Sequence, residues 1–262
     1  MSILIGLLIG LILGLTGSGG AILAVPLLIY LLHLHPSQAI GMSLGVVASS
    51  ALLGVIRNIN KDRIQWLPAV VFAAIGSAFT PLGHSINKQL PETTILLCFS
   101  VVVILVAITM WKRSYQPDTI DLPTNAGLCP PEFKAAGKLG HRCLMGIFVG
   151  AAVTGTLSGL FGVGGGFIII PTLTLLLGIG MQKAIATSLF IICVVSTAGF
   201  INYVLSSPVI DLILLAKIIA GGSIGMLIGQ HYSQRLSGPK LQRSFVIIML
   251  AVALFMIGKT FL

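Results

Sequence analysis

Two glycine-rich stretches interrupt apolar runs and leave backbone N–H groups without side-chain cover. The first reads GLTGSGG over residues 14–20, and the second reads GLFGVGGG over residues 159–166. A helix that begins after either stretch presents several free N–H donors and about half a unit of positive charge. Helix N-termini of this kind bind anions. The two stretches therefore predict an anion site made mainly of backbone.

The residue types around these stretches define the candidate substrate-binding positions. Thr16 and Ser18 place hydroxyl donors in the first stretch, whereas Phe161 and Val163 stand at the corresponding positions of the second. A serine later in each half adds a hydroxyl near the start of an apolar segment, although such a hydroxyl can instead bond to its own helix. The candidates are Thr16, Gly17, Ser18, Gly19, Gly20, Ser43, Gly162, Gly164, Gly165, Gly166, Ser188 and Lys217.

Lys217 is the one cation that falls well inside an apolar segment. A charge in the membrane interior is expensive, so its presence is by default a functional hypothesis. The alternative is that its long side chain carries the ammonium group to the membrane surface. The sequence supports both interpretations equally.

The composition predicts an all-α integral membrane protein. Hydrophobic residues make up 56% of the chain and charged residues 8%, and the mean hydropathy is +1.08. Soluble domains carry about 25% charged residues, so this chain could not cover a water-exposed surface. The net charge of +9 fits the Lys and Arg of cytoplasmic loops rather than a nucleic-acid partner.

Apolar segments and one polar stretch set the domain organisation. Residues 112–140 are rich in Pro, charge and turn residues, and they divide the chain. We expect a single membrane domain over 1–262, with a first repeat at 1–111, a linker loop at 112–140 and a second repeat at 141–262. The predicted segments are 2–15, 20–34, 37–57, 64–86, 93–111, 141–160, 165–178, 183–205, 209–231 and 242–261.

The two halves repeat at a fixed offset that places Gly14 on Gly159. Residues Gly14–Asn58 match Gly159–Tyr203 without a gap, and after a one-residue slip Gly76 and Gly83 match Gly222 and Gly229. Fixed spacing of Gly, Pro and Ser supports a duplication. Identical pairs include Gly17/Gly162, Gly19/Gly164, Gly20/Gly165, Pro26/Pro171, Ser43/Ser188 and Gly54/Gly199.

An odd number of segments in each repeat predicts that the second repeat is inverted relative to the first. The distribution of Lys and Arg tests this, because cytoplasmic loops collect these residues. Alternate crossings place twelve on one side, from Arg57 to Arg243, and only Lys88 and Lys259 on the other. We therefore expect both termini outside and the 112–140 loop in the cytoplasm.

The glycine stretches flank segments that are too short to span a membrane comfortably. A spanning helix needs about 20 residues, whereas segments 2–15, 20–34 and 165–178 have about 14 or 15. Paired short segments at matching places in inverted halves indicate a transporter site built on broken or re-entrant helices. We expect residues 16–20 and 162–166 to be non-helical and to face each other near the midplane. The other paired glycines are expected to serve helix packing.

Other chemistry finds little support in the sequence. All six carboxylates fall in loops or at segment ends, so neither an enzyme nor a buried proton relay is expected. Cys129 and Cys143 flank His141 but lack a paired-cysteine spacing, so no metal or other cofactor is expected. The expected partners are a small anion and the lipid bilayer, with the oligomeric state not specified. An anion channel, or a membrane subunit without a transport role, remains the alternative.

The doubled motif resembles the TauE/SafE-type sulfite exporter family, also called TSUP. The first copy reads GLTGSGGAILAVPLL and later QAIGMSL, and the second reads GLFGVGGGFIIIPTL and later KAIATSL. The resemblance covers nearly the whole chain. It implies a secondary transporter of sulfite, sulfoacetate or other organosulfonates in a bacterial-type inner membrane, and we expect export. Ala-Thr-Ser stands at 186–188 but Gly-Met-Ser at 41–43, so a threonine role is implied only for the second half. The matched positions are Gly17, Gly19, Gly20, Pro26, Gly162, Gly164, Gly165 and Pro171.

Overall fold

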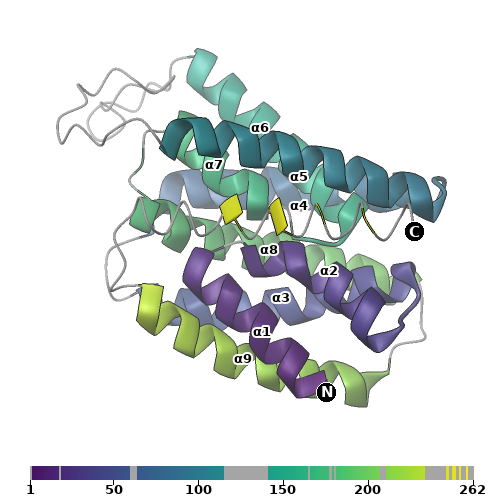
Figure 1. Ribbon diagram of the computed structural model, residues 1–262. Coiled ribbons are helices and arrows are strands. Elements are labelled where there is room, and N and C mark those ends of the chain that lie inside the picture. Colours follow the sequence, from purple (N-terminus) through teal and green to yellow (C-terminus); the bar gives the residue numbers. More distant parts are fainter. Residues whose placement is uncertain are drawn as a thin grey trace.

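The computed structural model is a bundle of helices, and no strand occurs in the part of the chain it describes (Figure 1). The helices are α1 (Ser2–Thr16), α2 (Gly19–Leu32), α3 (Pro36–Ile59), α4 (Trp66–Asn87), α5 (Glu92–Ser114), α6 (His141–Phe161), α7 (Gly166–Leu176), α8 (Met181–Ser206) and α9 (Leu212–Ser233). The structure describes residues 2–17, 19–59, 64–114, 141–164, 166–176, 179, 181–206 and 211–233, together with 246, 247, 250, 251, 254 and 258.

The first nine predicted segments are confirmed as helices with ends shifted by a few residues. The tenth, 242–261, lies mostly outside the described residues, as does most of the 112–140 loop. Among the described helices, four are long and apolar enough to cross a membrane, namely Pro36–Ile59, Trp66–Asn87, Gln182–Ser206 and Leu212–Ser233. The shorter apolar helices are Ser2–Thr16 and Gly20–Leu32, and within α6 the stretch Met145–Phe161 is apolar.

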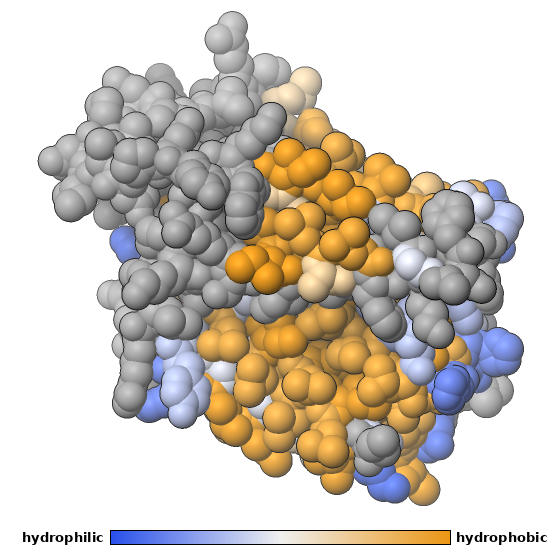
Figure 2. All heavy atoms as spheres, in the orientation of Figure 1, coloured by the Kyte–Doolittle hydropathy of each residue, from blue (hydrophilic) through white to orange (hydrophobic). Residues whose placement is uncertain are grey.

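The surface matches a lipid environment. On the face shown in Figure 2, apolar residues cross the middle and hydrophilic residues gather at the left and right edges, where helices end. A soluble monomer rarely exposes so large an apolar patch. The chain is therefore a multi-pass membrane protein. Large apolar side chains at the surface include Leu67, Val101, Leu105 and Ile224.

Glycines bring α1 and α9 into backbone contact. Gly6, Gly10 and Gly14 recur every four residues, so they share one face of α1. Gly6 lies against the Ile218 carbonyl and Gly14 against that of Met226. Because later residues of α1 meet later residues of α9, the two helices run in the same direction. They lie side by side along one edge of the bundle (Figure 1).

The same packing joins α4 to α6. Gly155 lies against Gly76, and Gly159 lies against the Thr80 carbonyl. These helices also run in the same direction. Since α6 and α4 occupy the positions in their repeats that α1 and α9 occupy in theirs, each pair joins one helix from each half of the chain. The packing role expected for Gly76, Gly83, Gly222 and Gly229 is confirmed, because a Cβ on each would meet a neighbouring helix.

The central helices of the two repeats, α3 and α8, run antiparallel. Gly41 in the first part of α3 lies against the ring of Tyr203 near the end of α8. Gly54 near the end of α3 lies against Leu189 near the start of α8. The repeat-equivalent helices thus point in opposite directions through the middle of the bundle.

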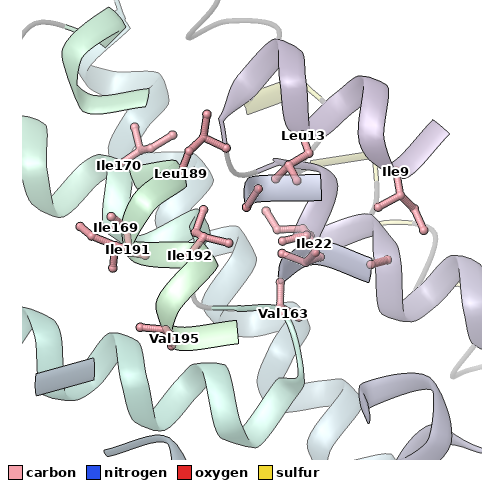
Figure 3. Packing of buried hydrophobic residues seen from close by; sticks show 14 of the residues in the cluster. Ile9, Leu13, Ile22, Val163, Ile169, Ile170, Leu189, Ile191, Ile192 and Val195 are labelled. Carbon is pink, nitrogen blue, oxygen red and sulfur yellow. The ribbon is translucent and has the colours of Figure 1, made fainter. Parts of the chain in front are cut away.

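One apolar core fills the space between these helices. Figure 3 shows part of it, with Ile9 and Leu13 of α1 and Ile22 of α2 on one side and residues of α8 on the other. Val163, from the second glycine stretch, belongs to the same cluster and is fully buried. The core therefore continues from one repeat into the other.

We predict that Gly10→Ala destabilises the fold. The added Cβ would lie 2.7 Å from the Gly222 carbonyl carbon, so α1 would move away from α9 at a loss of about 1–3 kcal/mol. Gly258→Ala is the matched control, because a Cβ there meets no atom within 4 Å. Thermal unfolding of the detergent-purified proteins should show a lower Tm for Gly10→Ala alone; equal values would contradict the packing described.

Candidate functional site

The first break separates α1 from α2 at a single described residue. Gly17 has φ of +76°, a conformation that glycine adopts far more readily than other residues. Its N–H donates to the Leu13 carbonyl at 2.7 Å and closes the last turn of α1. The next helix begins at Gly19, so the chain reverses within two residues.

The second break repeats this geometry. Gly162 has φ of +67° and donates its N–H to the Ser158 carbonyl at 2.9 Å, and Gly164 has φ of +65°. The described non-helical residues are 162–164, and α7 begins at Gly166. Positive φ at repeat-equivalent glycines shows that both breaks need glycine for their backbone path.

Both breaks are narrower than the sequence suggested. The expectation that 16–20 and 162–166 are non-helical is wrong at the edges: Thr16 ends α1, Gly19 and Gly20 begin α2, and Gly166 begins α7. One left-handed glycine suffices to end a helix, and glycine is tolerated in the first turn of the next. Ser18 and Gly165 lie outside the described residues.

A serine of each repeat contacts the break of the opposite repeat. The Ser43 hydroxyl lies 2.5 Å from the Gly162 carbonyl oxygen, and the Ser188 hydroxyl lies 3.4 Å from the Gly17 carbonyl oxygen. Each hydroxyl also lies within reach of a carbonyl in its own helix. Because a hydroxyl has one proton, it donates to one of these acceptors at a time. Each serine thus positions the break of the opposite repeat, and substrate contact by either serine stays a prediction.

Reciprocal packing accompanies these contacts. A Cβ on Gly17 would meet the side chain of Ile185 in α8, and a Cβ on Gly162 would meet Ile40 in α3. Ile40 and Ile185 are themselves equivalent positions in the repeat. A two-fold relation between the repeats requires such an exchange of partners.

Beyond these contacts, the second break lies near the middle of the bundle. Gly164 lies against Val47, Ile192 and Ser196, which are central residues of α3 and α8. Gly20 packs against α1, and α2 contacts α7. The N-terminal ends of α2 and α7 therefore lie in the interior. Beside the second of them, the fully buried Ser196 hydroxyl has no hydrogen-bond partner in the described structure.

The structure also describes the surroundings of two other candidates, Thr16 and Lys217. The Thr16 hydroxyl donates to the Ile12 carbonyl at 2.7 Å, so its proton is held within α1. Lys217 is exposed on α9 and lines neither of the two cavities described below. Its position favours a side chain that reaches the membrane surface over one that faces a site.

A cavity of about 220 Å³ lies at the end of the bundle where α3 begins and α4 ends. It reaches the second break through Phe161 and Val163, and among its described lining residues the charged one is Lys88. The remaining lining residues are Val25, Ile29, Pro36, Ser37, Ile40, Asn87, Leu90, Ile95 and Phe99.

A second cavity, of about 20 Å³, lies at the opposite end, where α8 begins and α9 ends. It is lined by Gly14, Asn58, Gln182, Ile185, Ala186, Gln230 and Ser233. Three pairs of lining residues correspond in the repeat, namely Ser37/Gln182, Ile40/Ile185 and Asn87/Ser233. The two cavities are thus repeat-equivalent in position and unequal in volume.

Three residues that are not among the sequence-based candidates make contacts near the breaks or line a cavity. The Thr187 hydroxyl accepts the Gln65 N–H at 3.1 Å, just before α4. The Asn87 amide donates to the Leu160 carbonyl at 2.6 Å, next to the second break. Lys88 supplies a positive charge to the lining of the larger cavity. The Ala-Thr-Ser motif pointed to Thr187, whereas no local pattern marked Asn87 or Lys88.

The family follows from a match over residues 2–256, described as sulfite exporter TauE/SafE. The chain belongs to this family. Curated relatives of this TauE/SafE protein carry transporter names. A "Probable membrane transporter protein" of Xylella fastidiosa is 32% identical over 97% of this chain and 93% of its own. "Probable membrane transporter protein YjnA" of Bacillus subtilis is 31% identical over 97% of this chain and 98% of its own.

No solved structure matches this TauE/SafE chain. The family and the names of its members indicate a membrane transporter rather than an enzyme. Among the described residues, no group of three His, Cys, Asp or Glu side chains could hold a metal ion; Cys129 lies outside them.

We predict that the two serines protect opposite breaks. Ser43→Ala removes a donor from the Gly162 carbonyl, and leaving a buried polar group unpaired costs about 1–3 kcal/mol. Hydrogen exchange should therefore speed up in residues 159–166. Ser188→Ala should speed exchange in residues 14–20 instead.

Ser49→Ala is the control for this pair of variants, because the Ser49 hydroxyl bonds only within α3 in the described structure. Faster exchange in the break of the same repeat, or no change in either break, would contradict a contact across the repeats.

Proposed function

We propose that this protein is a secondary transporter that exports small sulfur-containing anions such as sulfite, sulfoacetate or other organosulfonates. The anion binds beside the glycine breaks, where the N-terminal ends of α2 and α7 lie in the interior. The chain forms one domain in a bacterial-type inner membrane, as two inverted repeats joined by the 112–140 loop. The antiparallel course of α3 and α8 supports the inversion.

The observation that carries this proposal is the pair of repeat-equivalent cavities with unequal volumes. If the repeats exchanged conformations, the larger cavity would open at the opposite end of the bundle. Transporters built from inverted repeats expose a fixed site to each side in turn by such an exchange. The buried Val163 closes the inner end of the larger cavity in this state, which supports a transporter over a permanently open channel.

The chemistry of the lining supports an anion. Among the described residues, no carboxylate lines either cavity, and Lys88 lines the larger one. Helix N-termini and a buried hydroxyl supply hydrogen-bond donors at the second break. The Ser196 hydroxyl, which has no partner in the described structure, is free to donate to an anion beside Gly164.

Flux through proteoliposomes tests the function. Vesicles that contain the purified protein should show saturable uptake and counterflow of sulfite or sulfoacetate and no transport of alkali cations. Flux of cations alone, or linear flux without counterflow, would exclude the proposed transporter.

We predict that Ser196→Ala weakens anion binding without destabilising the protein. A hydrogen bond to a charged group contributes about 1.5–3 kcal/mol, so affinity should fall by about tenfold or more. Ser50→Ala is the matched control, because that serine is also fully buried and without a partner in the described structure but lies against Gly222. Titration calorimetry and Tm measure both properties. Equal affinities for the two variants would place the anion elsewhere.

We also predict unequal labelling at repeat-equivalent positions. In a background with the four native cysteines replaced by serine, Ile40→Cys lines the larger cavity and Ile185→Cys the smaller one. A small impermeant thiol reagent added outside intact cells should label only Ile40→Cys. Labelling of Ile40→Cys only from the cytoplasmic side would reverse the proposed orientation, and equal labelling of both would contradict a one-sided state.

A further inference from the structure

We infer that the larger cavity selects an organic anion with an apolar body, whose charged group lies at Lys88 and whose body lies against the apolar wall. This inference rests on the proposed transport of anions and adds the class of substrate: the larger cavity holds the anion, with its charged group at Lys88, before the anion moves to the donors beside Gly164. It assigns the specificity of the larger cavity to Lys88 and to the side chains that face it.

The wall of the cavity is apolar over most of its length. Nine of its twelve described lining residues are apolar, and they come from α2, α3, the α4–α5 connection, α5, the end of α6 and the second break. Burial of apolar ligand surface against such a wall is favourable, whereas a hydrated inorganic anion gains nothing from it. The apolar lining residues are Val25, Ile29, Pro36, Ile40, Leu90, Ile95, Phe99, Phe161 and Val163.

The polar lining residues gather where α3 begins and α4 ends. Asn87 already donates its amide to the Leu160 carbonyl, and Ser37 and Lys88 are exposed. Among the described lining residues, Lys88 is therefore the one that attracts an anion by charge. A ligand that satisfies both parts of the cavity has a negative group at this end and apolar atoms beyond it.

The volume supports a body of several carbon atoms. The cavity encloses about 220 Å³, which is several times the share of liquid volume that one water molecule takes up. Sulfite has four heavy atoms and would leave much of the wall facing water. A straight-chain sulfonate with a longer carbon chain, such as pentanesulfonate, would cover far more of it.

The test is a titration of the purified full-length protein with a series of anions. Methane-, propane- and pentanesulfonate should bind progressively more tightly, by about three- to fourfold for each added CH₂ group. Pentanoate should bind with an affinity close to that of a sulfonate of similar chain length. Sulfite and the uncharged 1-pentanol should bind weakly. Uptake of the same compounds into proteoliposomes should show the same order.

Variants separate the two parts of the cavity. Lys88→Gln should weaken binding of every sulfonate by about three- to tenfold, since the ammonium group is solvent-exposed, and Lys88→Arg should restore it. Ile29→Trp should fill the cavity and abolish the dependence on chain length while leaving the effect of Lys88→Gln. Lys217→Gln, at an exposed lysine away from both cavities, should change nothing.

The outcomes distinguish this inference from the proposed function. Sulfite binding and transport equal to those of pentanesulfonate would overturn the inference and leave the proposed function intact. Affinity that is independent of chain length, or 1-pentanol binding as tightly as pentanesulfonate, would also overturn it. Transport of none of these anions by folded protein would overturn both.

Discussion

Close backbone packing through glycine holds the two halves of this protein together. Gly10 meets Gly222 between α1 and α9, and Gly155 meets Gly76 between α6 and α4. Within lipid, helices gain little from burying apolar side chains against each other, so close approach and good packing decide which helices associate. Each pair joins the two repeats, and each pair includes the helix that leads into a glycine break. The positions of both breaks therefore depend on these contacts.

Backbone geometry and a few hydroxyl groups then define the interior. The left-handed Gly17 and Gly162 end α1 and α6 abruptly, and Ser43 and Ser188 fasten each break to the central helix of the other repeat. The chain can then start α2 and α7 inside the bundle, where free N–H groups in lipid would otherwise be costly. The larger cavity reaches the second break from the end of the bundle where α3 begins and α4 ends.

Much of this architecture could be predicted from the sequence, because apolar runs bounded by glycine, proline and charge mark helix ends directly. The repeat also identified Ser43 and Ser188 as equivalent positions. Their partners could not be predicted, since the contacts join residues 119 and 171 positions apart. Lys88 was missed for a similar reason: its role comes from a cavity whose walls belong to distant helices, and no local pattern records that.

The pairing of α1 with α9 has a consequence for how the protein is made. The glycine face of α1 leaves the ribosome first, whereas its partner follows only after α8 has been synthesised. Until then, α1 has no surface that its closely spaced glycines fit, and α4 must likewise wait for α6. Neither half contains a complete set of partners, so membrane insertion of the separate segments precedes assembly of the bundle. A chain truncated before α9 would leave α1 without its main support.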